Sequence, residues 1–302
     1  MENRNKKAWL YLLPAMLFLG AFMVYPLIDV LIYSVEEGYN FVTQSFYGYG
    51  AYNYLYVLHD PLFLQALKNT FILVVITVPL STAVALLISV ALSSVKAVKK
   101  AFQTIYFLPY VTNTLAVGMV FMVLFDKTEY TDGLFNMLIK LFGGNAVDFI
   151  NGPYWAKMLV LCLYTVWVVM PFKVLVLTSA LASVKKDYYN AAKVDGTSKW
   201  RTFTKITVPM ISPMLFYLVI TGFIGAWNDY MTPYLYLPEF PTLATGIYEL
   251  RSKVEKSRDP LYYDQWPRMF AVMIWSILPV LVLFIAFQDR IMTMTSGGGI
   301  KE

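Results

Sequence analysis

The sequence contains few of the residues from which metal sites and disulfides are built. Its 302 residues include one cysteine, Cys162, and one histidine, His59. These counts exclude an internal disulfide and a Cys/His zinc cluster. Because Cys162 lies in an apolar run and His59 lies in a predicted loop, we expect a packed thiol and a solvated imidazole.

Motifs for nucleotide hydrolysis and other catalysis are also missing. No GxxxxGK(S/T) phosphate-binding loop occurs, and the glycine run SGGGIKE lacks the Ser or Thr that must follow the lysine. No HExxH or GxSxG motif occurs, and Asp29 and Asp289 lie at the ends of apolar runs without an obvious partner. We therefore predict a chain that is not an enzyme and that holds no cofactor or metal itself.

Charged residues are scarce as well. They make up 14% of the chain, whereas hydrophobic residues make up 58% and aromatic residues 17%. Soluble domains carry about a quarter charged residues. This composition is typical of a polytopic membrane protein that is surrounded by lipid.

Six apolar runs reach the roughly 20 residues that a helix needs to cross a bilayer. The first is too long for a signal-peptide core and lacks a small-residue cleavage site, so we expect it to remain as a span. We predict an all-α fold with an N-terminus over 1–8, a six-span domain over 9–287 and a tail over 288–302. The predicted spans are Trp9–Ser34, Phe71–Leu92, Phe102–Phe125, Lys157–Leu181, Pro213–Leu237 and Met269–Phe287.

The basic residues indicate how these spans are oriented. Lys and Arg precede the first span, fill the loop after the second and crowd the loop after the fourth, whereas the opposite loops are longer and more acidic, apart from residues 251–268. Cytoplasmic loops carry the excess of Lys and Arg. Both termini and the loop after the fourth span are therefore predicted to be cytoplasmic. The net charge of +5 suits an anionic inner leaflet, so no nucleic-acid partner is expected.

The loop after the fourth span has an ordered pattern of its own. Its centre reads NAAKVDGTSKWRTFTKITVP from Asn190 to Pro209. A helix with small residues on one face is predicted to break at Asp195 and Gly196, because glycine adopts positive φ at low cost.

The chain is then predicted to resume as a second helix. Thr197 or Ser198 supplies the N-cap, and the amphipathic helix carries Phe203 and Ile206 until it ends at Pro209. A helix-turn-helix this exposed requires a partner surface for its small-residue face and its apolar ridge.

Three spans carry polar and aromatic residues, which recur at helical spacing in the third and fourth spans and are consecutive in the fifth. Residues four apart share one face of a helix, so these side chains are predicted to point together into the bundle. The candidates are Tyr110 and Thr114 in the third span, Thr165, Val169 and Phe172 in the fourth, and Trp227, Asn228 and Asp229 in the fifth.

The fifth-span carboxylate is the most informative of these groups. An intramembrane Asp229 is costly in lipid and is expected to face protein or a watery cavity. Carboxylate, amide and hydroxyl groups with flat rings suit a sugar site, since the polar groups bond the hydroxyls and the rings cover the C–H faces. An interhelical hydrogen-bond cluster that only holds the bundle together is the alternative. The chemistry of the residues leaves both open.

Several segments resemble one family. LLPAMLFLGAFMVYPL in the first span, GAYNYLYVLHDPLFLQALKNT before the second, FLPYVTNTLAVGMVFMVLF in the third and the loop after the fourth look like the carbohydrate-uptake ABC permeases of bacteria, which include the maltose and glycerol-phosphate permeases. The resemblance implies an inner-membrane subunit that works by alternating access. Its implied partners are a second permease, two ATPase subunits carrying ATP and magnesium, and an extracytoplasmic solute-binding protein.

The resemblance also implies roles for particular residues. It places sugar contacts on the LPY segment with Tyr110 and Thr114, around Pro171, and in WNDY with Asp229. It makes the loop over about 183–212 the coupling segment that docks on the ATPase. The docking residues are Asn190, Ala191, Ala192, Asp195, Gly196, Ile206 and Pro209.

Two features depart from the family pattern. Asn190 stands where the family loop usually has Glu, so this position keeps a hydrogen-bond acceptor but lacks the charge for an ion pair with the ATPase. The first five spans resemble the permease type that carries the sugar site, whereas the tail FQDRIMTMTSGGGIKE resembles its companion type.

The class of solute and the energy source remain separate questions. An ion-driven carrier or channel is the rival, but it would need several intramembrane carboxylates or an inverted repeat, which the sequence lacks. Aromatic density favours a neutral, ring-bearing solute such as an oligosaccharide. Lys173 is the one intramembrane cation seen for a phosphorylated solute.

Overall fold

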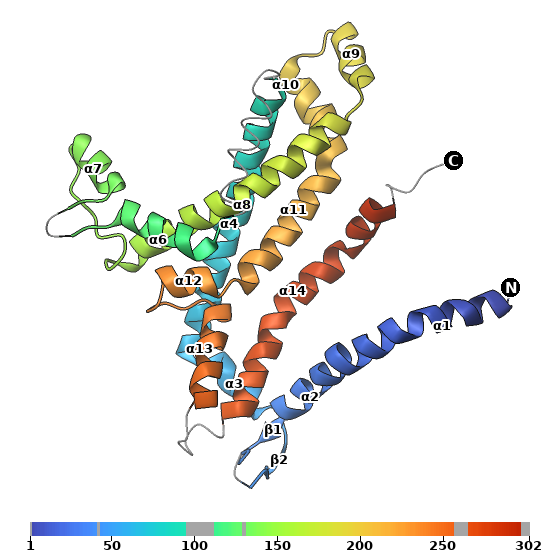
Figure 1. Cartoon of the computed structure of the whole chain (residues 1–302), viewed down its shortest axis with the longest axis vertical. Coiled ribbons are helices and arrows are strands. Elements are labelled where there is room, and N and C mark those ends of the chain that lie inside the picture. Colours follow the sequence, from blue (N-terminus) through green and yellow to red (C-terminus); the bar gives the residue numbers. More distant parts are fainter. Residues whose placement is uncertain (1, 41–42, 95–111, 129–130, 257–264, 297–302) are drawn as a thin grey trace. The chain divides into compact units, whose positions relative to one another are not determined.

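The computed structural model describes residues 2–40, 43–94, 112–128, 131–256 and 265–296 (Figure 1). The chain forms two compact units, which are described separately. The hairpin unit comprises Met1–Leu64 and Gly246–Pro279, and the α8 unit comprises Gln65–Thr245 and Val280–Glu302. The helices α4, α13 and α14 each pass from one unit into the other.

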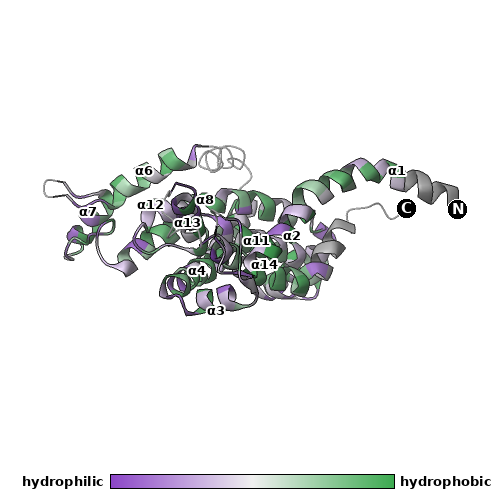
Figure 2. Cartoon of the chain, turned by 90° about the horizontal axis from the view of Figure 1, so that it is seen from below, coloured by the Kyte–Doolittle hydropathy of each residue, from purple (hydrophilic) through white to green (hydrophobic). Residues whose placement is uncertain are grey.

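Five described helices are long and apolar enough to cross a membrane, and one shorter apolar helix accompanies them. Their hydrophobic residues dominate the colouring of α4, α6 and α14 in Figure 2. The predicted all-α, polytopic fold class is confirmed, while residues 102–111 of the predicted third span lie outside the described residues. The long segments are Trp9–Ser34, Pro61–Ser93, Tyr154–Ser183, Lys199–Asn228 and Gln265–Gln288, and the shorter one is Leu115–Phe125.

The hairpin unit begins with one helical segment and continues into a small hairpin. Helix α1 (Glu2–Leu19) passes through a π-helical turn, η1 (Gly20–Val24), into α2 (Tyr25–Ser34). Strands β1 (Glu36–Glu37) and β2 (Gly48–Tyr49) pair antiparallel with Glu36 opposite Tyr49. The unit also contains α3 (Tyr52–His59), most of α13 (Leu243–Lys256) and the first part of α14 (Gln265–Ser296).

Side-chain amide and ring contacts hold the hairpin unit together. Asn53 Nδ2 donates to the carbonyl oxygens of Ser34, at 3.1 Å, and Glu36, at 2.7 Å, so it links α3 to the end of the first span. The Tyr33 ring stacks on Phe270 at 5.8 Å between centroids. The Arg268 guanidinium lies 4.2 Å from the centroid of the Tyr56 ring.

The α8 unit is built around one long, buried helix. Its helices are α4 (Pro61–Ser94), α6 (Thr114–Phe125), α7 (Leu134–Leu141), α8 (Tyr154–Ser183), α9 (Lys186–Val194), α10 (Lys199–Thr202), the π-helical turn η2 (Phe203–Thr207), α11 (Val208–Asn228) and α12 (Met231–Tyr236). Half of the most apolar part of α8 is buried. Leu161 and Tyr164 of α8 pack with Leu73, Phe125 and Tyr236 in the core.

Two buried asparagines fix the loops of this unit. Asn69 Nδ2 donates to the carbonyl oxygens of Phe240 and Pro241, and its Oδ1 accepts a hydrogen bond from the Tyr154 hydroxyl. Asn136 bonds the backbone of Asp126 and Val147 in the same manner. Each amide satisfies backbone groups that the loops leave unpaired.

Two predicted spans differ from the helices of the structure. Helix α6 begins only at Thr114, because the Asn113 side chain caps it by accepting from the N–H groups of Leu115 and Ala116. Helix α11 ends at Asn228, before the predicted limit at Leu237. Helix α14 continues as far as Ser296, whereas its apolar span ends at Gln288, close to the predicted limit at Phe287.

Candidate functional site

A cavity of about 300 Å³ lies between α4, α8 and α11. We call it the α8 cavity. It contains hydroxyl groups, one carboxylate, one amine and one phenyl ring in an otherwise apolar lining. The residues around it are Thr77, Val78, Ser81, Thr165, Val168, Val169, Phe172, Lys173, Leu218, Thr221, Gly222, Gly225, Ala226 and Asp229.

Two threonine hydroxyls of this cavity have no hydrogen-bond partner in the described structure. They are the Oγ1 atoms of Thr77 on α4 and Thr165 on α8, and both side chains are buried. An unsatisfied buried hydroxyl costs about 1 to 3 kcal/mol. Such hydroxyls are therefore expected where a solute or water supplies the missing bonds.

The Lys173 amine ties α8 to α4 beside the cavity. Its Nζ donates to Ser81 Oγ at 2.7 Å, Thr82 Oγ1 at 2.9 Å and the Val78 carbonyl oxygen at 3.3 Å. An ammonium group has three donors, so these acceptors use all of them. A Cβ at Gly222 would lie 3.1 Å from Nζ, so the absence of a side chain lets α11 approach the amine closely.

Asp229 lies at a break in the chain instead of inside a helix. Its backbone is extended, with φ −72° and ψ 110°, and α11 ends one residue earlier. Its Oδ1 accepts a hydrogen bond from the Thr232 N–H at 3.1 Å, which caps the start of α12. The prediction of a carboxylate within a continuous fifth-span helix is wrong, because this local bond stabilises a turn instead.

The structure brings four of the predicted path residues to the α8 cavity. Thr165, Val169 and Phe172 line it from α8, and Asp229 lines it from the end of α11. Their placement agrees with the predicted stripe of residues on one face. Their contact with a solute stays a prediction.

Two other candidates in the fifth span point elsewhere. Trp227 is buried against Phe71 and Phe223, with both ring centroids 5.3 Å from its own. The Asn228 side chain is exposed and its Nδ2 donates to the Ile224 carbonyl oxygen of the same helix. These contacts correspond to packing and to a local helix bond.

The third-span pair lies at the edge of the described structure. Tyr110 is outside the described residues, and of Thr114 only the backbone at the start of α6 is described. Thr112 and Asn113 are not helical. The predicted helix face shared by Tyr110 and Thr114 is therefore interrupted between them.

Sequence reasoning missed the contribution of α4. Thr77 and Ser81 are four residues apart and so share one face of that helix. This spacing was available in the sequence, but no aromatic or charged residue lies beside it between Ile72 and Ser94 to mark the face, as such residues did in the other spans. The bonding of Lys173 to α4 required the tertiary structure, because its partners are more than 90 residues away in the chain.

The basic loop, over 183–212, forms a second candidate region. Helix α9 ends at Val194, and Gly196, which follows the C-cap Asp195, has φ +67°. The Thr197 N–H donates to the Ala192 carbonyl oxygen and the Gly196 N–H donates to that of Lys193, which is the Schellman pattern of a helix C-terminus. The predicted break at Gly196 is confirmed.

The second helix of the basic loop starts as predicted but does not end as predicted. Ser198 Oγ accepts from the Arg201 N–H and caps α10. Phe203 and Ile206 lie in η2, and the chain continues without a break into α11. The predicted end at Pro209 is wrong, because a local π-helical turn such as η2 lets a membrane helix continue through a proline.

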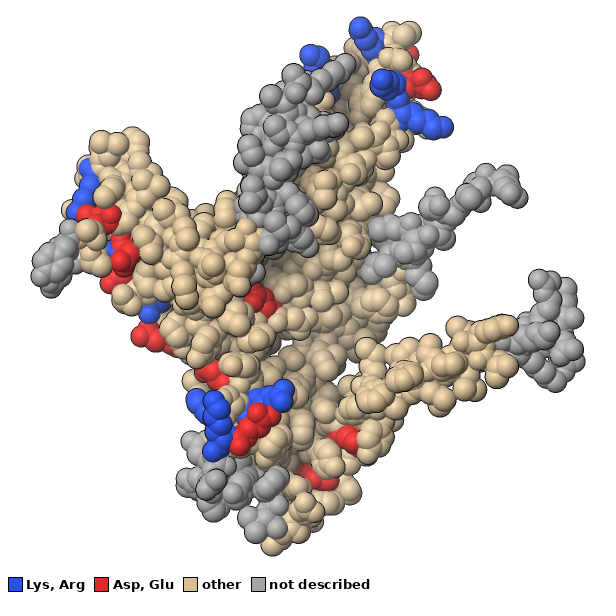
Figure 3. Space-filling view, in the orientation of Figure 1, with Lys and Arg blue, Asp and Glu red and all other residues tan. Residues whose placement is uncertain are grey.

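The surface of the basic loop combines charge with exposed apolar groups. Val194 is 86% exposed and Trp200 is 73% exposed. Figure 3 shows charged side chains gathered over α9 and α10, whereas the visible surface of α8 and α11 is almost free of charge. Of the predicted docking residues, Ala192 is buried, Ile206 is half-buried, and Asn190, Ala191, Asp195, Gly196 and Pro209 are exposed.

Known proteins share both the sequence and the fold of this chain. Residues 78–294 match the family described as the binding-protein-dependent transport system inner membrane component. The chain belongs to this family. The match covers the basic loop and every residue that lines the α8 cavity except Thr77, and it identifies the chain as an inner-membrane component of a transport system.

Individual relatives agree with this assignment. The lactose transport system permease protein LacF of Rhizobium radiobacter is 32% identical over 72% of this chain and 71% of its own length. The arabinooligosaccharides transport system permease protein AraP of Bacillus subtilis is 29% identical over 76% of this chain and 72% of its own length. Both relatives are permeases. This agrees with the prediction that the present chain is not an enzyme.

A solved structure shows the same fold. It is a bacterial alginate ABC transporter in complex with an alginate pentasaccharide-bound periplasmic protein. One of its chains matches the present chain with a TM-score of 0.74 and 22% identity, and the match covers 96% of each chain.

Proposed function

We propose that this chain is a permease subunit of an ATP-driven importer and that it moves a sugar, of oligosaccharide type, into the bacterial cell. The α8 cavity carries this proposal, because it places unpartnered Thr77 and Thr165 hydroxyls beside the Asp229 carboxylate and the Phe172 ring. Polar groups of this kind bond sugar hydroxyls, and the ring covers an apolar sugar face. Relatives named for lactose and arabino-oligosaccharide transport support the same solute class.

The bonding of Lys173 favours a neutral solute. All three donors of its ammonium group are used by acceptors on α4, so the amine offers no vacant donor to a phosphate group. A neutral sugar needs only hydrogen bonds to Thr77, Thr165 and Asp229. The cavity is therefore better suited to a sugar than to glycerol phosphate.

The proposed assembly contains four other proteins. A second permease subunit pairs with this chain, two ATPase subunits hold ATP and magnesium, and an extracytoplasmic solute-binding protein delivers the sugar. The solved alginate transporter in complex with its periplasmic protein supports the last of these partners. Both termini and the basic loop then lie on the cytoplasmic side.

The basic loop is proposed to couple ATP hydrolysis to transport. Its helices project charged and apolar side chains, among them Trp200 and Val194. Exposed apolar groups rimmed by charge are typical of protein interfaces. A rigid turn at Gly196 transmits a movement of the ATPase to α8 and α11, and the cavity opens alternately to each side of the membrane.

Transport by the reconstituted assembly tests this function. The two permeases and the ATPase are placed in liposomes, and the binding protein is screened against neutral and phosphorylated mono- and oligosaccharides. We expect uptake of a neutral sugar that requires ATP and the binding protein. Uptake that continues without ATP and follows a proton or sodium gradient would show an ion-driven carrier instead.

A further inference from the structure

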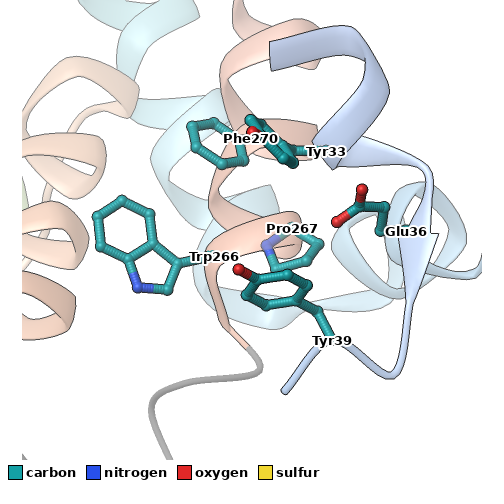
Figure 4. Close-up of a pocket in the computed structure, with 6 residues that line it drawn as sticks. All are labelled: Tyr33, Glu36, Tyr39, Trp266, Pro267 and Phe270. Atoms are coloured by element: carbon teal, nitrogen blue, oxygen red, sulfur yellow. The ribbon is translucent and has the colours of Figure 1, made fainter. Parts of the chain in front are cut away.

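The hairpin unit contains a second pocket, which the proposed transport function does not use. Its volume is about 170 Å³. Figure 4 shows rings on several sides and one carboxylate directed toward Pro267 and Tyr39. Its lining consists of Tyr33, Glu36, Tyr39, Trp266, Pro267 and Phe270.

The Glu36 carboxylate is placed unusually for an acid at the surface of a membrane protein. The residue is 5% exposed, and its Oε2 atom has no hydrogen-bond partner among the described residues. No Lys or Arg in the described part of the chain forms an ion pair with it. Burial raises the pKa of the Glu36 carboxyl above its ordinary value. A buried carboxylate without a compensating charge is expected to take up a proton or to bind a cation.

The rings around Glu36 decide which cation fits. Tyr33 and Phe270 stack at 5.8 Å, and Trp266 lies 6.0 Å from Phe270 between centroids. Aromatic faces attract organic cations through their quadrupoles, and Trp, Tyr and Phe cages recognise alkylammonium groups. A calcium ion would need about six to eight oxygen ligands, which these six residues do not supply.

We propose that this pocket binds an alkylammonium group, with Glu36 as the counter-ion and the aromatic side chains as the walls. The pocket lies where the first span ends at Ser34 and where α14 begins at Gln265. These are positions at the depth of lipid headgroups. An ethanolamine or choline headgroup and a free ammonium solute therefore share the chemistry that the pocket recognises.

Binding of choline to the purified full-length chain tests this site. The chain is placed in phosphatidylglycerol nanodiscs, which contain no ammonium headgroup, and binding is followed by saturation-transfer NMR. We expect saturable binding of choline and at least about tenfold weaker binding of its uncharged isostere 3,3-dimethylbutan-1-ol, because only the cation gains the electrostatic attraction. Equal binding of the two molecules would overturn the proposal and leave a purely apolar pocket.

Matched variants separate the counter-ion from the fold. Glu36→Gln keeps the shape of the side chain and is expected to weaken choline binding about tenfold, as is Trp266→Leu. Glu37→Gln is the control. The Glu37 carboxylate is adjacent to Glu36 in the chain, but it accepts a hydrogen bond from the Tyr52 N–H and does not line the pocket. This variant should bind choline as the unchanged chain does. Equal affinity in Glu36→Gln and the unchanged chain would also overturn the proposal.

The source of the ammonium group is decided with phosphatidylethanolamine nanodiscs. If the headgroup is the natural occupant, it competes with choline, so the unchanged chain binds choline more weakly in phosphatidylethanolamine than in phosphatidylglycerol nanodiscs. Glu36→Gln then shows no such difference between the two lipids. If choline binds equally in both lipids, the occupant is a soluble ammonium compound. Absence of choline binding in phosphatidylglycerol would refute an alkylammonium site of either kind.

Discussion

The α8 cavity and the basic loop are two polar regions of the α8 unit, and they are constructed in opposite ways. The cavity collects Thr77, Thr165 and Asp229 from three segments far apart in the chain, and its two threonine hydroxyls have no hydrogen-bond partner among the described residues. The loop is one continuous stretch in which backbone bonds at Ala192 and Lys193 and the Ser198 cap satisfy the helix ends locally. The proposed function requires this difference. A solute site needs polar groups that are free to form hydrogen bonds with the solute, whereas a coupling element needs a rigid shape.

Changing the shape of the basic loop should have the largest effect. Gly196 has φ +67° and open space around its Cα. A Val at this position would cost about 1 to 2 kcal/mol in that conformation and would displace the turn between α9 and α10. We expect Gly196→Val to reduce ATP-driven uptake to background while ATP hydrolysis by the assembly continues. Uptake and hydrolysis measured on the same liposomes check this uncoupling.

A second glycine supplies the matched control. Gly143 also has positive φ, +81°, with open space around it, but it follows α7 in a different loop. Gly143→Val carries a similar conformational cost and should leave uptake near that of the unchanged chain. If both variants lose uptake equally, the effect is general destabilisation and the coupling role of the basic loop is contradicted.

The contrast between the regions also explains what the sequence could predict. The turn at Gly196 and the Ser198 cap depend on bonds between residues close in the chain, so composition and spacing sufficed for both. The end of the second helix was mispredicted at Pro209, because the π-helical turn η2 allows the helix to continue through this proline.

The cavity was predictable only in part. The stripe Thr165, Val169 and Phe172 follows from helix periodicity, and it lines the cavity. Trp227 carried the same sequence signal, but the rings of Phe71 and Phe223 hold it in a separate cluster. Packing partners such as these are distant in sequence, and no local pattern records them.

Removing the charge from the cavity should have an intermediate effect. Asp229→Asn keeps an oxygen that accepts from the Thr232 N–H, so the turn before α12 should persist. A hydrogen bond to a charged group contributes about 1.5 to 3 kcal/mol, and its weakening should lower uptake of the neutral sugar about tenfold. Initial uptake rates at saturating binding protein measure the change.

The control for this charge lies in another turn. Asp148 Oδ1 accepts from the N–H groups of Ile150 and Asn151 before α8, so Asp148→Asn makes the same change in a local cap outside the cavity. We expect unchanged uptake there. Equal losses in the two variants would assign Asp229 to the stability of its turn and remove it from the solute path.

The smallest effect is the most specific, because it separates binding from stability. Thr165→Val replaces a buried hydroxyl, which has no hydrogen-bond partner in the described part of the chain, with a methyl group of similar shape. The empty protein should become more stable by about 1 kcal/mol, while loss of one neutral hydrogen bond to the sugar should lower uptake about fivefold. Thermal unfolding in detergent and uptake in liposomes therefore move in opposite directions.

Thr178 tests this separation within the same helix. Its hydroxyl is also buried and unpartnered among the described residues, but the side chain does not line the α8 cavity. Thr178→Val should raise the unfolding temperature as Thr165→Val does and leave uptake unchanged. A fall in uptake in both variants would mean that α8 needs these hydroxyls for its movement. A fall in Thr165→Val alone would indicate that the Thr165 hydroxyl forms its hydrogen bond with the solute.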